Sequence, residues 1–233
     1  MSSKRILGII PARGGSRGIP RKNLIKLAGR PLLSYTIEAA KKSRLLTRTV
    51  LSSEDPEIIQ EAKKLGADIA FTRPAQLSTD SAGSASVVKH ALEEIESQEA
   101  NKYDYVCLLE PTCPLRISDD IDSALKLLIE SGADSVVSVK KIEAPHPVKT
   151  LLIKGGYLTP FLPDRWKSSL TRQELEPVFA VNGAVYAVKR EVLLKTVSLW
   201  GERALPFIMP DERSINIDTP FDAALAEFLL TLR

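Results

Sequence analysis

Apolar and polar residues follow two patterns along most of the chain, one typical of short buried strands and one typical of amphipathic helices. Strands are predicted where short apolar runs occur, at residues 5–11, 47–52, 68–71, 105–109, 135–139, 184–188 and 205–209. Between them, apolar positions recur with helical spacing, as in Val88, Ala91, Leu92 and Ile95. Strands that alternate with helices predict an α/β fold with a mostly parallel sheet and helices on both faces.

Capping residues set the expected limits of several helices. Asp55 before Pro56 predicts a helix that begins there and ends near Gly66. Ser118 is predicted to cap the helix after the 105–109 strand. Thr219 stands three residues before an aspartate, which is the spacing of a capping box. The helix that follows is expected to pack on the core through Phe221, Ala224, Leu225, Phe228, Leu229 and Leu232.

The regular alternation stops at residues 140–178. Prolines recur there, and Lys154-Gly155-Gly156 between short apolar pieces predicts a hairpin turn. An excursion of this kind is typical of a lid, a substrate-binding arm or an oligomerisation arm. We therefore expect a core made of residues 1–139 and 179–233, with 140–178 inserted as an arm.

Composition and charge limit the function without naming one. The net charge of +3 is small, and lysines and arginines do not form a stripe interleaved with aromatics, which argues against a nucleic-acid partner. Cys107 and Cys113 have neither metal-ligand spacing nor the numbers of a disulfide framework. The first apolar run, residues 6–10, is too short for a signal peptide or a membrane span. We expect a cytoplasmic protein with no membrane partner.

The most informative stretch is residues 11–23, directly after the first strand. It combines backbone-permissive glycines with cations, namely Gly14, Gly15, Gly18, Arg13, Arg17, Arg21 and Lys22. Its spacing matches neither a P-loop nor a dinucleotide fingerprint. The density of cations favours phosphoryl or nucleotidyl transfer over hydride transfer, because negative charge shifts onto a leaving pyrophosphate. We interpret the loop as the site of a nucleoside triphosphate; the alternative is a solvated surface turn.

Asp218 is the best candidate for a metal ligand. It ends an extended apolar segment just before a predicted helix, a position that suits Mg²⁺, although a carboxylate there also complements the helix dipole. Asn182 either makes a turn with Gly183 or contacts the acceptor. In the 140–178 arm, His146 with Lys149 can face an anionic substrate, or be an ordinary loop residue.

Several motifs, in this order, resemble those of the acylneuraminate cytidylyltransferases. They lie at residues 10–23, 73–74, 77–80, 108–116, 146–150, 182–186 and 217–219. The resemblance implies a Rossmann-like core of the nucleotidyltransferase type with a small dimerisation arm, a homodimer, and the use of CTP and Mg²⁺. The implied reaction transfers CMP to the anomeric hydroxyl of a nonulosonic (sialic-type) acid and releases pyrophosphate. A cytidylyltransferase for an eight-carbon 3-deoxy-ulosonate and a non-catalytic nucleotide- or sugar-binding relative are the alternatives.

The resemblance also implies roles for single residues. Catalytic roles fall to Arg13, Lys22 and Asp218. Nucleotide contacts fall to Ala12, Arg13, Lys22, Asn23, Arg73 and Ser84. Sugar contacts fall to Glu110, Thr112, Lys149, Arg172 and Tyr186, and metal binding to Asp218 with Asn216.

Two positions depart from the pattern that the family often shows. Asn216 stands where an aspartate is common, so one metal ligand is neutral. Glu110 stands where a glutamine is common, and an ionised glutamate cannot donate a hydrogen bond to an N-acyl carbonyl. The acceptor therefore stays open between N-acetylneuraminate, legionaminate, pseudaminate and a deaminated nonulosonate.

Overall fold

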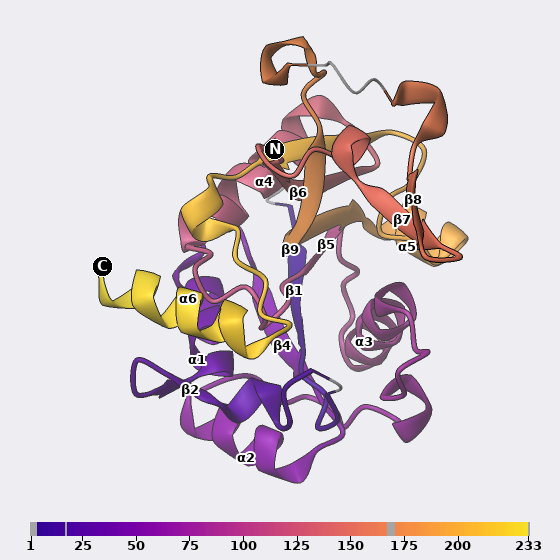
Figure 1. The fold of residues 1–233 in the computed structure, drawn as a ribbon. Helices are drawn as coiled ribbons and strands as arrows, with labels where there is room; N and C mark the ends of the chain where they lie inside the picture. Colours follow the sequence, from indigo (N-terminus) through magenta and orange to yellow (C-terminus); the bar gives the residue numbers. More distant parts are fainter. Residues whose placement is uncertain (1–3, 17, 167–170, 233) are drawn as a thin grey trace.

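A six-stranded sheet forms the centre of the computed structural model, which describes residues 4–16, 18–166 and 171–232 (Figure 1). The strand order is β10-β6-β9-β5-β1-β4. The strands are β1 (Ile6–Pro11), β4 (Arg48–Ser52), β5 (Tyr105–Leu108), β6 (Ser135–Lys141), β9 (Phe179–Lys189) and β10 (Ala204–Ile208). β1 is parallel to β4 and β5, and β6 is parallel to β10. β9 runs antiparallel to both β5 and β6, so the predicted mostly parallel sheet is confirmed with one reversed strand.

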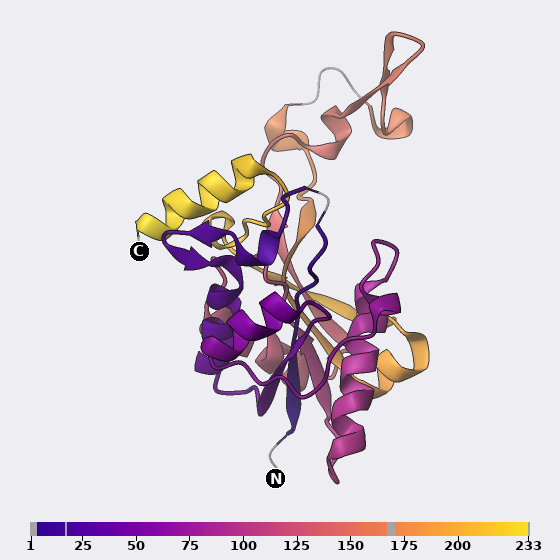
Figure 2. The same ribbon diagram turned by 90° about the horizontal axis from the view of Figure 1, so that it is seen from below.

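Helices cover both faces of this sheet, as predicted (Figure 2). Their bounds are α1 (Leu32–Lys42), α2 (Pro56–Lys64), α3 (Ser84–Gln98), α4 (Ser118–Ser131) and α5 (Arg190–Thr196). Because strand side chains alternate between faces, Ile6 and Ile10 of β1 enter the core shared with α1, α2 and α4. Leu7 and Ile9 enter the core shared with α3 and α5. β1 is therefore buried from both sides, and its carboxyl end is a rigid base for the loop that follows.

Capping confirms two of the predicted helix starts. The Asp55 carboxylate accepts hydrogen bonds from the backbone N–H groups of Glu57 and Ile58, both at 3.0 Å, and Pro56 is the first residue of α2. Thr219 and Asp222 form the expected capping box of α6 (Pro220–Thr231). These caps fix the chain at two points next to the loops after β4 and before α6.

Two local predictions are wrong. Ser118 is the first residue of α4 rather than its cap, and the Asp120 carboxylate accepts a hydrogen bond from the Ile117 N–H at 3.0 Å instead. The expected strand at 68–71 is an extended segment joined to β4 by the bridge between Val50 and Asp68. An apolar run shows that a segment packs against its neighbours, and Ile69, Ala70 and Phe71 are half-buried here, but it forms a strand only where a neighbour offers a continuous ladder.

The last helix, α6, packs differently from the prediction. It lies against the small hairpin of β2 (Lys26–Leu27) and β3 (Arg30–Pro31), where Ala226 joins a core with Leu27. The side chains of Phe221, Phe228 and Leu232 are 75%, 59% and 68% exposed. The expectation that this apolar side packs on the core holds for Leu229 and is wrong for these three residues, because Ala223, Ala226 and Leu230 make the other contacts.

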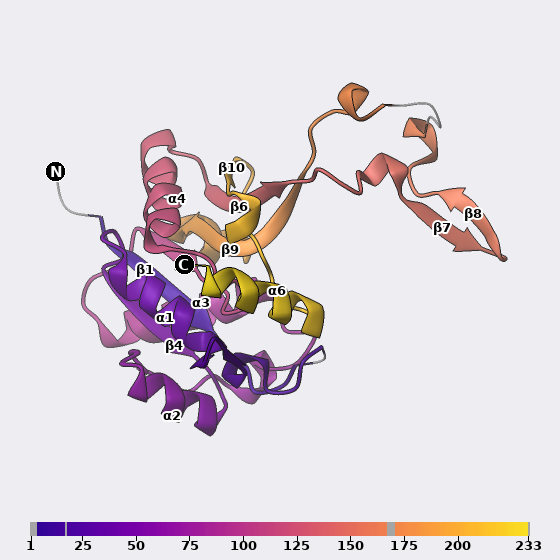
Figure 3. The ribbon, with the colours of Figure 1, turned by 60° about the vertical axis from the view of Figure 1, so that its left-hand side comes forward.

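The segment between β6 and β9 leaves the sheet and ends in a two-stranded hairpin (Figure 3). β7 (Leu151–Lys154) and β8 (Tyr157–Pro160) are antiparallel. Gly155 and Gly156 join them with φ values of 56° and 85°, which confirms the predicted turn. The hairpin exposes large apolar side chains, with Ile153 at 77% and Tyr157 at 79%. Within the described residues, no helix is long and apolar enough to cross a membrane.

Candidate active site

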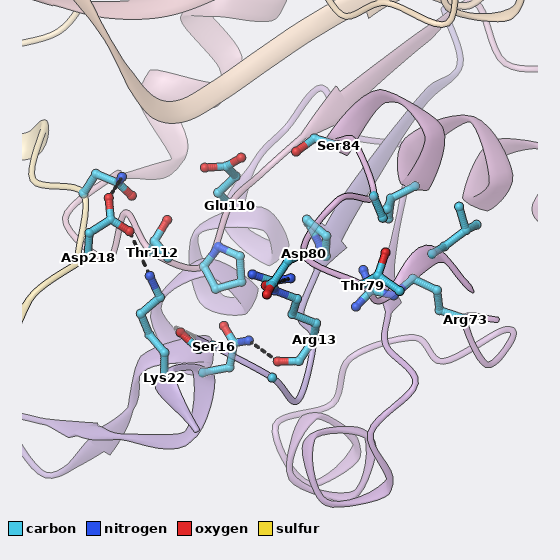
Figure 4. A pocket seen from close by; sticks show the side chains of 18 residues that line it. Arg13, Ser16, Lys22, Arg73, Thr79, Asp80, Ser84, Glu110, Thr112 and Asp218 are labelled. Carbon is cyan, nitrogen blue, oxygen red and sulfur yellow. Dashed lines mark hydrogen bonds and ion pairs between the residues drawn. The ribbon is translucent and has the colours of Figure 1, made fainter. Parts of the chain in front are cut away.

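A pocket of about 290 Å³ opens at the carboxyl ends of β1 and β5 (Figure 4). Open α/β sheets bind ligands at this edge, because the loops after neighbouring strands meet there. The predicted site residues that line it are Arg13, Lys22, Asn23, Arg73, Ser84, Glu110, Thr112, Asn216 and Asp218. Residues far apart in the sequence are thus brought to one cavity.

The loop after β1 passes very close to neighbouring groups at two of its glycines. A Cβ atom at Gly14 would lie 2.3 Å from the Asp55 carboxylate, and one at Gly18 would lie 2.2 Å from the Asp218 carbonyl oxygen. At Gly18 the neighbour is backbone, so only glycine fits there, whereas a side chain at Gly14 would have to displace the Asp55 carboxylate. The Asn23 amide donates to the Arg13 carbonyl at 2.9 Å, which fixes the loop from inside. Buried Ala12 does not line the pocket and instead anchors the loop to β4 through its backbone N–H.

Lys22 joins this loop to the segment before α6. Its ammonium donates to the Ile217 carbonyl at 2.7 Å and to the Asp218 carboxylate at 2.9 Å. The Asn216 amide donates to the other Asp218 oxygen at 2.8 Å. The Ile217 N–H donates to the Thr112 carbonyl at 2.9 Å, so the loop after β5 belongs to the same network.

Two carboxylates that sequence reasoning missed hold the other cations of the site. Arg13 forms an ion pair with Asp80 at 2.8 Å. The buried Arg73 guanidinium pairs with Glu54 at 2.7 Å, and Glu54 also accepts hydrogen bonds from Gly14 N–H at 2.7 Å and from the Ser78 hydroxyl at 2.9 Å. The signal for Glu54 was its position two residues after the end of β4, at the edge where the strand ends meet.

The Glu54 contacts outweigh the cost of its burial. Burial alone raises the pKa of a carboxyl group, but the hydrogen bonds from Arg73 and Gly14 lower the pKa of Glu54 below its ordinary value. Glu54 is therefore ionised and links the loop after β1 to Arg73.

Glu110, two residues beyond β5, presents a different kind of carboxyl group. Within the described part of the chain its carboxylate has no hydrogen-bond partner. Gly183 of β9, at φ 77°, lies so close that a Cβ there would be 2.9 Å from a Glu110 oxygen. Burial raises the pKa of Glu110 to about 7 against the opposing charge of Arg116, and the nearby Asp218 adds to the rise. With a pKa of about 7, Glu110 is not held ionised at neutral pH in the way that Glu54 is.

The buried Arg116 fixes the backbone under Glu110. Its guanidinium donates to the Glu110 carbonyl at 3.2 Å, to the Ala184 carbonyl at 2.7 Å and to the Thr36 hydroxyl at 2.6 Å. Burial lowers the pKa of Arg116. This side chain ties the end of β5 to β9 and to α1, so the position of Glu110 is set by three elements.

Other predicted sugar contacts lie away from the pocket within this chain. Lys149 sits in the arm, with its ammonium over the Trp166 ring at 5.8 Å from the ring centre. Arg172 also belongs to the arm, and its side chain lies outside what the structure describes. Tyr186 is on β9, where burial and then the charge of Glu110 raise the pKa of its phenol, but it does not line the pocket.

The two polar residues with open alternatives are used inside the fold. The Asn182 amide is buried, donating to the Ser214 hydroxyl at 2.9 Å and accepting from the Ser138 hydroxyl at 2.6 Å. The His146 ring accepts a hydrogen bond from the Val148 N–H at 3.3 Å and caps a short turn. The interpretation that Asn182 contacts an acceptor is therefore replaced by a structural role.

The oxygen atoms next to Lys22 suit a hard cation. Asp218 offers a carboxylate and Asn216 an amide oxygen, and Mg²⁺ commonly binds one or two such protein oxygens together with water and substrate phosphates. Among the described residues there is no cluster of three or more histidine, cysteine, aspartate or glutamate side chains that could enclose a metal by itself.

Comparison with known proteins places these features in context. The cytidylyltransferase family model matches residues 7–204. A pseudaminic acid cytidylyltransferase of Campylobacter jejuni is 36% identical over 223 residues, covering 96% of this chain and 95% of that protein. A CMP-N,N'-diacetyllegionaminic acid synthase of Legionella pneumophila is 33% identical, covering 98% and 97%. An N-acylneuraminate cytidylyltransferase of Escherichia coli is 34% identical, but the match spans only 51% of its length.

Solved structures agree with the fold. A CMP:2-keto-3-deoxy-manno-octonic acid synthetase complexed with CTP superposes with a TM-score of 0.70 at 18% identity, covering 98% of this chain and 99% of that one. A 4-diphosphocytidyl-2C-methyl-D-erythritol synthase gives 0.63 at 15% identity, covering 97% and 99%.

Proposed function

The chain belongs to the cytidylyltransferase family, and from this premise we propose that it transfers CMP from CTP to the anomeric hydroxyl of a nonulosonic acid, giving a CMP-sugar and pyrophosphate. The relatives named above act on pseudaminic, legionaminic and acylneuraminic acids, which supports this class of acceptor. The observation that carries the proposal is the meeting of Arg13 and Lys22 with Asp218 in one pocket.

The donor half of the reaction uses the loop after β1. Arg13 and Lys22 bind the triphosphate and stabilise the charge that develops on the leaving pyrophosphate. Asn23 and the backbone at Ala12 keep this loop in place, while Arg73 and Ser84 hold the nucleoside on the far side of the pocket.

Mg²⁺ is the cofactor we propose, held by Asp218 and Asn216. When bound, it supplies neutralisation of the phosphates. Lys22 now occupies one Asp218 oxygen, and we expect it to turn to phosphate when the nucleotide enters. A single carboxylate favours weak metal binding that depends on the nucleotide.

The acceptor half combines the pocket with the arm at 140–178. Glu110 and Thr112 line the pocket and Tyr186 lies on β9, whereas Lys149 and Arg172 belong to the arm. We propose a cytoplasmic homodimer in which the arm of one subunit completes the sugar site of the other. The exposed Ile153, Tyr157 and Leu158 of the hairpin support a buried position of the arm in such a dimer.

The test is pyrophosphate release with CTP, Mg²⁺ and a panel of acceptors. The panel holds pseudaminate, legionaminate, N-acetylneuraminate, a deaminated nonulosonate and an eight-carbon 3-deoxy-ulosonate. Release with a nine-carbon acid supports the proposal, and release with the eight-carbon acid alone would replace it. CTP binding without release for every acceptor would identify a non-catalytic relative.

A further inference from the structure

We propose that Glu110 is the general base that removes the proton from the attacking anomeric hydroxyl, an inference that rests on the proposed function. It names a chemical role for a residue that the family pattern places only near the sugar. A glutamine, which the family often has at this position, cannot accept a proton, so the role belongs to chains that carry glutamate.

The placement of Glu110 suits this step. Its carboxylate lies on the pocket wall between Asp218 and Ser84, with Thr112 beside it (Figure 4). The nucleotide side of the pocket and the segment that would hold the metal are therefore both adjacent to it. An acceptor hydroxyl directed at the α-phosphorus from this wall has a carboxylate oxygen next to it.

Competing bases in the described pocket are occupied. Asp218 accepts hydrogen bonds from Lys22 and Asn216 at 2.9 and 2.8 Å, one on each oxygen. Asp80 is paired with Arg13 at 2.8 Å. Neither His90 nor His146 lines the pocket. Among the described pocket-lining carboxylates, Glu110 alone keeps its oxygen lone pairs available for a proton.

The surroundings of Glu110 tune it for this task. The charged and titratable groups that face it are Arg116 below, Cys113 and Tyr186 beside it, and Lys22 and Asp218 across the pocket. Burial is the largest influence and brings the pKa to about 7. A general base works best when its pKa lies near the working pH, because it is then both ionised and basic enough to take a proton.

The proposed step conserves atoms and charge. The hydroxyl proton moves to a Glu110 oxygen while the hydroxyl oxygen forms a bond to the α-phosphorus of CTP. The bond between the α-phosphorus and the oxygen bridging to the β-phosphate breaks, and its electron pair leaves with pyrophosphate. Glu110, now a neutral carboxylic acid, returns the proton to water after the products leave.

The deciding variant is Glu110→Gln, which keeps the shape of the side chain. We expect kcat to fall by roughly 10²- to 10⁴-fold, the usual contribution of a general base, with the KM for CTP within about twofold of the wild type. In the wild type, kcat/KM should decrease as the pH is lowered through about 7. This acidic limb of the pH profile should be absent in Glu110→Gln. Glu110→Asp should keep the limb at a reduced rate, and the exposed Glu57→Gln on α2 serves as the control.

A readout that needs no turnover accompanies the kinetics. In protein labelled with ¹³C at the glutamate carboxyl carbons, one resonance should titrate near pH 7 and be missing from Glu110→Gln. An active Glu110→Gln that keeps kcat within about threefold and retains the limb would overturn the inference while leaving the proposed function intact. A wild type that releases no pyrophosphate with any acceptor would overturn the proposed function, and this inference with it.

Discussion

Glu54→Gln is the sharpest test of how the pocket is held together. The Glu54 carboxylate accepts hydrogen bonds from Gly14 N–H on one oxygen, and from Arg73 and Ser78 on the other. A glutamine has one acceptor oxygen and one NH₂ group of almost the same size. Whichever way the amide turns, its NH₂ must face either the Gly14 N–H or the Arg73 guanidinium, so one donor loses its partner.

The magnitude follows from the burial of the two partners. The Arg73 side chain is 3% exposed and the Glu54 side chain is 23% exposed. Removing one partner of a buried ion pair costs about 3–5 kcal/mol, and a hydrogen bond to a charged group is worth about 1.5–3 kcal/mol. Because water reaches Glu54 and the amide keeps one contact, we expect the free energy of unfolding to fall by about 2–3 kcal/mol, which lowers the Tm by about 4–12 °C for a domain of this size.

The assay is thermal unfolding with and without CTP, together with the KM for CTP. Arg73 loses its orientation in Glu54→Gln, so the KM should rise about tenfold, equivalent to about 1.4 kcal/mol. The folded-state pKa of Glu54 is lowered, so its stabilisation is present above the ordinary glutamate pKa and is lost as pH falls through the lower folded value. The difference in Tm from the wild type should therefore be full at pH 7 and shrink below about pH 4.

Glu57→Gln is the matched control for this experiment. Glu57 also contacts an arginine, Arg21, but its side chain is 69% exposed, and such pairs contribute about 0–1 kcal/mol. If Glu54→Gln has the same Tm as the wild type at pH 7 and the same KM for CTP, Glu54 does not link the loop after β1 to Arg73.

Three further variants separate catalysis, metal binding and stability. Lys22→Ala should lower pyrophosphate release by about 10²- to 10³-fold while circular dichroism shows a folded protein, and near-normal turnover would remove Lys22 from the mechanism. Asn216→Asp places a second carboxylate beside Asp218, so its Tm should fall in EDTA and rise more with Mg²⁺ than that of the wild type; equal shifts would exclude Asn216 from the metal site. Arg190→Ala removes the hydrogen bonds at 2.7 and 2.8 Å that the buried Glu96 accepts from Arg190. The free energy of unfolding should therefore fall by about 3 kcal/mol while kcat stays unchanged. An unaltered Tm would contradict this.

The sequence pattern predicts the strands and helices better than their arrangement. The apolar rhythm identifies β9 as a strand, but it carries no information about direction. Because a long segment separates β6 from β9, β9 could join the sheet in either direction. It lies between β5 and β6 and is antiparallel to both. In α6 apolar residues lie on more than one side, and periodicity does not say which of them is covered, so Phe221 of the predicted face remains 75% exposed.

Some residues of the candidate site can be predicted from the sequence, and others are revealed only by the fold. Arg13 and Lys22 stand out because they are close together in a glycine-rich loop, and a cation near phosphate follows from charge alone. Glu54 and Asp80 carry the wrong sign for a phosphate site, so the same argument passes them over. Only the fold shows that each one holds an arginine of the pocket. The pKa of Glu110 near 7 likewise depends on burial by β9, which no local spacing reveals.

Each cation among the described residues that line the pocket is paired with a carboxylate, so the charges of the resting site largely cancel. Arg13 with Asp80, Lys22 with Asp218 and Arg73 with Glu54 leave little net charge for small ions to screen. Under the proposed function, entry of a nucleotide with Mg²⁺ would be an exchange of partners, in which phosphate would take Arg13 and Lys22 and the released Asp218 could hold the metal. Since the counter-ions belong to the chain and stay at fixed concentration, we expect CTP binding to depend only weakly on ionic strength.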